Sequence, residues 1–205
     1  ADLNGDGRLD LVTSNRTSAN VSVLLGNGNG TFQSAVNYNY GRYLGGVSIA
    51  DVSGDGKPDL IIASALNNTT GVGVLLGNGN GTFQSPLSLT AGGPPVTVAT
   101  ADVNGDGNAD IVSANNNSTL SVFLSNGNGT FQTASTMAAG INPNSLALAD
   151  MNGDGKVDVI AGSYSTTTSV FLGNGNGTFQ AASAIALNGR QVALADVDGD
   201  GRTDI

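Results

Sequence analysis

One nine-residue window recurs five times along the chain and constrains its fold more than any other feature. The copies read DLNGDGRLD (Asp2 to Asp10), DVSGDGKPD (Asp51 to Asp59), DVNGDGNAD (Asp102 to Asp110), DMNGDGKVD (Asp150 to Asp158) and DVDGDGRTD (Asp196 to Asp204). Their starts lie 49, 51, 48 and 46 residues apart. A period of about 50 residues is typical of propellers and related arrays, so the chain is predicted to consist of repeated structural units.

A second marker recurs in phase with the first. It reads LGNGNGTFQ at residues 25–33, 76–84 and 172–180, and LSNGNGTFQ at 124–132. Glycine-rich segments can cradle phosphates, but no Gly-Lys-Ser/Thr follows here and no helix is predicted to open. Asn-Gly between two strands is a strong hairpin signal, because both residues tolerate positive φ. The marker therefore predicts a hairpin turn, and the phenylalanine after each turn is expected to wedge between neighbouring units.

Within each period the sequence predicts four short strands. One leads into the acidic window, as at residues 96–102, and a second leaves it, as at 59–64. A third precedes the glycine-rich turn, as at 72–76, and a fourth begins at each TFQ. The runs are short, β-branched and often alternating, and no stretch keeps a helical apolar period. The predicted fold is all-β, with propeller blades of four antiparallel strands in about four repeats of roughly 48–50 residues.

The repeats divide the chain without an obvious linker. We expect one repeat array over residues 1–205, with units at 1–50, 51–101, 102–149 and 150–195 and a partial unit at 196–205. A closed ring of four blades needs four acidic windows, whereas this sequence has five. The expectation is therefore a segment of a larger propeller or array, or an end blade that a neighbouring copy completes.

The composition excludes several kinds of chemistry. The chain has no cysteine, no histidine and no glutamate, which rules out disulfides, ordinary zinc sites and catalysis by thiolate or imidazole. The formal charge of −9 disfavours a nucleic-acid backbone or an anionic membrane as partner. No apolar run approaches the roughly 20 residues of a membrane helix. All sixteen aspartates lie in the five windows, so no carboxylate remains elsewhere for general acid–base catalysis.

The residue types at each window position favour calcium. Positions one, five and nine are Asp, position three is an oxygen donor, and glycines at four and six permit a sharp turn around an ion. The variable position seven is expected to contribute only its backbone carbonyl. The candidate ligands are Asp2, Asn4, Asp6, Arg8 and Asp10; Asp51, Ser53, Asp55, Lys57 and Asp59; Asp102, Asn104, Asp106, Asn108 and Asp110; Asp150, Asn152, Asp154, Lys156 and Asp158; and Asp196, Asp198, Asp200, Arg202 and Asp204.

These donors provide five or six oxygens per window, and waters would complete the 6–8 oxygen shell of Ca²⁺. Magnesium requires a stricter octahedron and softer metals prefer nitrogen or sulfur, so about one Ca²⁺ per window, up to five, is expected. An EF-hand is excluded because it needs a glutamate at position twelve and flanking helices. Five divalent ions would change the formal charge from −9 to +1.

The windows, the apolar strand before them and the exit strand, as in DLIIAS (59–64), together resemble the FG-GAP/VCBS repeats of integrin-like β-propellers. The LLGNGNGTFQ turn is similar to that of bacterial secreted proteins with such repeats. The resemblance covers essentially the whole chain. It implies calcium loops between the strands of a blade and an extracellular role in adhesion, recognition or structural assembly.

Three functions are weighed. The first is a non-enzymatic, extracellular or cell-surface calcium-binding module that recognises a protein or glycan, or that assembles with copies of itself through end strands. The alternative is a lectin-like, carbohydrate-binding propeller, for which Tyr38, Tyr40 and Tyr43 in the first repeat and Tyr164 in the fourth are the exposed-aromatic candidates. An enzyme is disfavoured, because no base or nucleophile pattern stands outside the windows.

Overall fold

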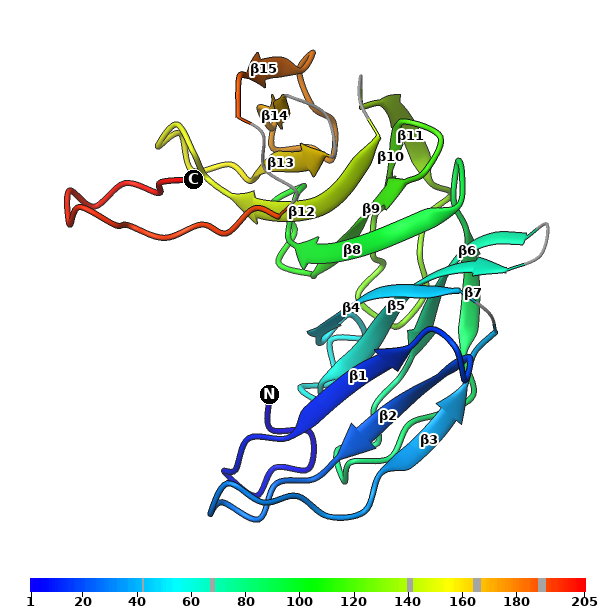
Figure 1. Ribbon diagram of the computed structural model, residues 1–205. Helices are drawn as coiled ribbons and strands as arrows, with labels where there is room; N and C mark the ends of the chain where they lie inside the picture. The colour runs from blue at the N-terminus through cyan, green and yellow to red at the C-terminus, as the bar shows by residue number, and fades with distance from the viewer. Residues whose placement is uncertain (42, 67–68, 140–141, 164–166, 188–190) are drawn as a thin grey trace.

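The computed structural model describes residues 1–41, 43–66, 69–139, 142–163, 167–187 and 191–205. These residues form fifteen β-strands in four antiparallel sheets (Figure 1). The described part of the chain contains no helix that could span a membrane.

The first sheet has β1 (Leu11–Asn15), β2 (Asn20–Leu24) and β3 (Val36–Asn39), and the second has β4 (Leu44–Ala50), β5 (Asp59–Leu66), β6 (Thr69–Leu75) and β7 (Leu87–Thr90). The third has β8 (Pro95–Ala101), β9 (Asp110–Asn115), β10 (Thr119–Phe123) and β11 (Ser135–Ala138), and the fourth has β12 (Pro143–Ala149), β13 (Asp158–Ser163), β14 (Thr168–Phe171) and β15 (Ser183–Ile185).

Each complete sheet follows the predicted order of a propeller blade, so the all-β prediction is confirmed. The strand before an acidic window pairs with the strand after it, which pairs with the third, which pairs with the fourth. Each four-stranded sheet begins seven residues before its acidic window, as Leu44 does before Asp51. The first sheet has the last three strands of this pattern.

The fourth strand of each blade begins later than its TFQ segment. The phenylalanine instead forms an isolated antiparallel bridge to the residue before the turn, as Phe83 does to Gly77. The chain then runs a few residues without pairing before β7 begins at Leu87. The tight Asn-Gly geometry brings the two ends of the turn together, so they form this bridge before the fourth strand begins.

Neighbouring blades lie side by side with their first strands parallel. Ser48 Oγ on β4 lies 3.0 Å from Thr100 Oγ1 on β8, and Gly45 packs against the backbone of Val96. Strands β8 and β12 are likewise in contact. The C-terminal ends of β4, β8 and β12 therefore point the same way, and the connections that follow them gather at one end of the molecule.

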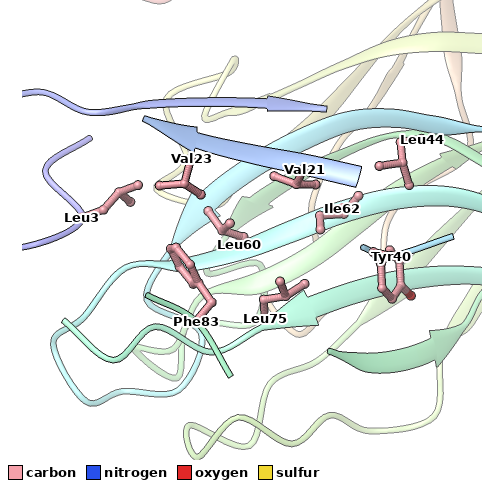
Figure 2. Close-up of a cluster of buried hydrophobic side chains, with 9 residues drawn as sticks. All are labelled: Leu3, Val21, Val23, Tyr40, Leu44, Leu60, Ile62, Leu75 and Phe83. Atoms are coloured by element: carbon pink, nitrogen blue, oxygen red, sulfur yellow. The ribbon is translucent and has the colours of Figure 1, made fainter. Parts of the chain in front are cut away.

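The apolar core lies between blades. Figure 2 shows the first cluster, in which Leu3, Val21 and Val23 from the first repeat meet Leu60 and Phe83 from the second. Two further clusters join the second blade to the third and the third to the fourth. Burial of one such side chain contributes about 1.5–3 kcal/mol, so the clusters between blades add hydrophobic stabilisation that a single blade would lack.

Candidate metal centre

The acidic windows form loops at one end of the sheets, here called the acidic end. Those of the second, third and fourth blades join β4 to β5, β8 to β9 and β12 to β13. The fifth loop, Asp196 to Asp204, is closed by an antiparallel bridge between Ala195 and Asp204. Its residues Gly201–Thr203 share a surface hollow with Asp150–Gly153 of the fourth loop. All sixteen carboxylates therefore lie at the acidic end.

The aspartate at position one organises the loop backbone. In the second loop, Asp51 Oδ1 accepts from Gly54 N at 2.7 Å and Oδ2 accepts from Gly56 N at 2.7 Å. The same pair of bonds forms in the other four loops. At Asp2 and Asp150 these amides lower the pKa of the carboxyl, and the position-six amide is the largest cause. A carboxylate that accepts several amide bonds stays ionised, as a cation ligand must.

At positions three and five, side-chain oxygens accept hydrogen bonds from backbone amides two residues further along the loop. Asn104 Oδ1 accepts from Asp106 N at 2.8 Å, and Asp106 Oδ1 accepts from Asn108 N at 2.8 Å. The position-five bond occurs in all five loops. Position three departs in the second loop, where Ser53 Oγ donates to Asp51 Oδ1 at 3.3 Å. Position five in all five loops, and position three in the four loops that have Asn or Asp there, are thus held in place by backbone amides. Further lone pairs are left on their oxygens.

Position seven places a cation beside position five in three loops. Lys57 Nζ lies 2.9 Å from Asp55 Oδ2, and the corresponding ion pairs are Lys156–Asp154 at 3.6 Å and Arg8–Asp6 at 3.8 Å. These are the ion pairs found among the described residues. The hydrogen bond from Lys57 lowers the pKa of Asp55. The pairs are exposed, so each contributes little to stability.

In the first four loops, the aspartate at position nine is buried and joins two parts of the blade. Asp59 Oδ2 accepts from Val52 N at 3.0 Å, and its Oδ1 accepts from Gly77 N at 2.7 Å. Asp10, Asp110 and Asp158 repeat both bonds, with the amides of Gly26, Ser125 and Gly173 in the role of Gly77. The glycine-rich turn is therefore fastened to the acidic loop. Sequence reasoning missed this role of the turn residue. The available signal was the recurrence of the second marker 22 to 25 residues after the start of each of the first four windows.

The geometry of the fifth loop fits a divalent cation. In the fifth loop, one carboxylate oxygen from each of Asp196, Asp198 and Asp204 lies within 4.8 Å of the other two. This places positions one, three and nine around a common point. Burial raises the pKa of Asp59 and Asp110, and neighbouring loop carboxylates add to the rise. A divalent cation would offset that repulsion, and every side-chain donor is a hard oxygen ligand.

The tyrosines predicted as exposed aromatics separate into two groups. Tyr40 is buried, and Tyr38 stacks edge-on against Phe83 with ring centroids 5.5 Å apart, so both serve the core. Tyr43 is 54% exposed. Tyr164 lies outside the described residues. Phe83 is wedged between blades as predicted, whereas Phe32 of the first blade is 44% exposed.

Comparison with known families decides the relationship. The family model described as FG-GAP-like repeat matches four times, at residues 2–62, 51–113, 102–161 and 150–205. The chain belongs to the FG-GAP-like repeat family. Each match begins at an acidic window and extends through the next one, so the family unit includes the loop, the blade and the following loop. No curated protein matches the chain by sequence.

Solved structures with the same architecture include three of different kinds. A lectin from Agrocybe aegerita, described as recognising non-reducing terminal N-acetylglucosamine, is 28% identical with a TM-score of 0.67, and the match covers 100% of this chain and 58% of the lectin. BBS1N, in complex with ARL6DN, is 13% identical with a TM-score of 0.63, covering 95% of this chain and 54% of that one. The Vibrio cholerae biofilm matrix protein Bap1 is 22% identical with a TM-score of 0.53, covering 99% and 32%. This FG-GAP-like chain thus spans little more than half of the first two.

Proposed function

We propose that this FG-GAP-like array is a non-enzymatic, calcium-stabilised module that recognises a protein or glycan surface outside the cell. The observation that carries the proposal is the shared frame of the five loops. Each loop presents oxygen donors on a backbone already turned by the position-one carboxylate, and three carboxylates of the fifth loop converge. The candidate ligands are the positions named above, with position seven contributing its carbonyl.

The loops have a structural task in this proposal. Ca²⁺ supplies positive charge among carboxylates that otherwise repel one another. Loop two is tied to the next blade, because Ser125 Oγ donates to Val52 O at 3.0 Å. Loops one and three are tied in the same way, by bonds from Gly81 N to Leu3 O and from Gly177 N to Val103 O, both at 3.1 Å. An ordered loop would therefore stabilise the interface between blades as well as its own blade.

An extracellular setting agrees with the chemistry of such a site. Calcium modules outside the cell commonly bind with dissociation constants of about 10⁻⁴–10⁻³ M, and partly exposed loops with waters in the shell are suited to that range. The absence of cysteine and histidine from the sequence, with every carboxylate in a loop, supports a binding role in preference to catalysis.

Thermal unfolding of the calcium-loaded and EGTA-treated chain tests the proposal. Each filled loop is expected to add roughly 2 kcal/mol at calcium concentrations some 50-fold above its dissociation constant, so the melting temperature should rise steeply with calcium. Magnesium at the same concentration serves as the matched control and should stabilise much less. Identical melting curves and circular dichroism in calcium and in EGTA would refute calcium binding by these loops.

A second candidate function is carbohydrate binding. It is favoured by the 28% identity to the Agrocybe aegerita lectin over the whole chain and by the exposed ring of Tyr43. Screening the calcium-loaded chain on a glycan array tests it. A complete absence of binding at saturating calcium would leave protein recognition as the remaining form of the proposal.

A further inference from the structure

The end of the sheets opposite the acidic loops carries a hollow that metal binding does not use. A cavity of about 270 Å³ is lined by Arg16, Tyr43, Pro94, Asn116 and Asn144, together with the first residues of β4 and β8. A second hollow of about 520 Å³ shares Arg16 and Tyr43 and extends over residues 17–19. Small-molecule sites in proteins have volumes of about 300–1,000 Å³, so the two hollows together are the size of a ligand site.

Tyr43 is the residue that departs from the repeat at this position. The strands β4, β8 and β12 begin at Leu44, Pro95 and Pro143, so Tyr43 corresponds to Pro94 and Asn142 in the next two blades. Its φ is +57°, a left-handed conformation that is unfavourable for a residue other than glycine. A tyrosine at a strained position, with 54% of its surface exposed, adds nothing to the core. Among the described non-glycine residues, positive φ is otherwise found at Ala19 and Ser118, which precede β2 and β10, so the strain before β4 belongs to Tyr43 and points to a role in binding.

Arg16 lies over the tyrosine ring without a carboxylate partner. Its guanidinium carbon is 5.9 Å from the centroid of the Tyr43 ring. The ion pairs of the described residues all lie in the acidic loops, at the other end of the blades. The side chain of Arg16 is exposed. A cation kept apart from all sixteen acids of a chain with formal charge −9 is available to an anionic ligand.

From this arrangement we propose that the hollow binds a carboxylated saccharide, such as a uronic acid unit of an acidic polysaccharide. The guanidinium fork matches a carboxylate with two parallel hydrogen bonds. The apolar face of a pyranose ring packs on the exposed ring of Tyr43. Asn116 is exposed beside the cavity and offers amide donors and an acceptor to sugar hydroxyls. Arg16 and Tyr43 border both hollows. Two adjacent sugar units of one polysaccharide can therefore occupy the two hollows, one on each side of these residues.

This inference rests on the recognition part of the proposed function and not on its metal part. Calorimetric titration of the calcium-loaded chain with a cello-oligosaccharide that contains glucuronate tests it, with the neutral cello-oligosaccharide of equal length as the matched ligand. Both solutions are dialysed against the same calcium buffer. Binding of the glucuronate form, at least about tenfold tighter than of the neutral form, is the expected result, because the charged hydrogen bonds are lost with the carboxylate.

Three variants distinguish loss of saccharide binding from loss of folding. Arg16→Gln and Tyr43→Asn should each weaken binding by about tenfold or more, whereas Tyr43→Phe keeps the ring and should bind as the original chain does. Asparagine tolerates positive φ, so Tyr43→Asn should fold with an unchanged melting temperature. Equal binding of both ligands, undiminished binding by Arg16→Gln, or no binding of the glucuronate form would overturn the inference. Calcium-dependent melting of the same samples reports on the proposed function separately: normal calcium stabilisation without saccharide binding rejects only the site.

Discussion

At the residue scale, aspartates at two positions of the second loop have different surroundings. Asp59 is fully buried and accepts backbone bonds from Val52, Ser53 and Gly77. Asp55, four residues earlier, is exposed and accepts from the Lys57 ammonium. The backbone bonds of Asp59 hold the blade together without an ion, whereas Asp55 lies at the exposed surface of the loop. Under the proposed function both residues are also calcium ligands.

This difference gives a stability prediction. Asp59→Asn replaces one accepting oxygen by an amide that faces a backbone donor, and each charged hydrogen bond lost costs about 1.5–3 kcal/mol. We expect unfolding in urea to show a loss of that size in both EGTA and calcium. The matched variant Asp55→Asn should be nearly neutral in EGTA and should reduce only the stabilisation that calcium adds. Equal losses for the two variants in EGTA would contradict the assignment of Asp59 as a structural bridge.

At the scale of elements, the first and second blades are in contact where the ring of Tyr40 packs on Gly73. Tyr40, just after β3, packs directly on the backbone of Gly73 in β6, and its hydroxyl lies 3.2 Å from Ser88 Oγ in β7 (Figure 2 shows the ring). A methyl group at residue 73 would occupy the space of the ring. The glycine at this strand position is therefore required by the adjacent blade.

Gly73→Ala is expected to destabilise the chain by about 1–3 kcal/mol, because the ring of Tyr40 must move from its packed position. In the background of Tyr40→Ala the same change should cost almost nothing, and a double-mutant cycle by urea unfolding measures the difference. Additive effects of the two substitutions would show that the contact between the blades is not the cause.

At the scale of the whole molecule, the charge is strongly segregated. All sixteen carboxylates lie in loops at one end, and the formal charge is −9. Such crowding destabilises the compact state through self-repulsion, and salt screens it over about 10 Å at 0.1 M.

The melting temperature in EGTA should therefore rise as sodium chloride increases from about 0.01 M to 0.15 M, the range over which the screening length falls from about 30 Å to 8 Å. With calcium saturating, five ions would bring the formal charge to +1 and the salt dependence should largely vanish. A salt dependence that is the same with and without calcium would argue against charge neutralisation by the loops.

The repeat, the turn markers and the four-strand pattern were readable from the sequence, because each depends on local spacing that recurs in phase. The strand after Phe83 began later than predicted, since the turn first closes through the bridge to Gly77. The position of the loops at one end was not predicted. It results from the parallel alignment of β4, β8 and β12 in neighbouring blades.

The sequence alone determined which residues form the loops and why they favour a hard cation with oxygen ligands, because the donors and glycines lie within nine consecutive positions. Only the tertiary structure decided that Asp59 is buried against Gly77, that Tyr38 and Tyr40 belong to the core, and that Tyr43 faces a hollow beside Arg16. These outcomes depend on what the adjacent strand or blade presents to each side chain, and such contacts between distant residues have no local signature in the sequence.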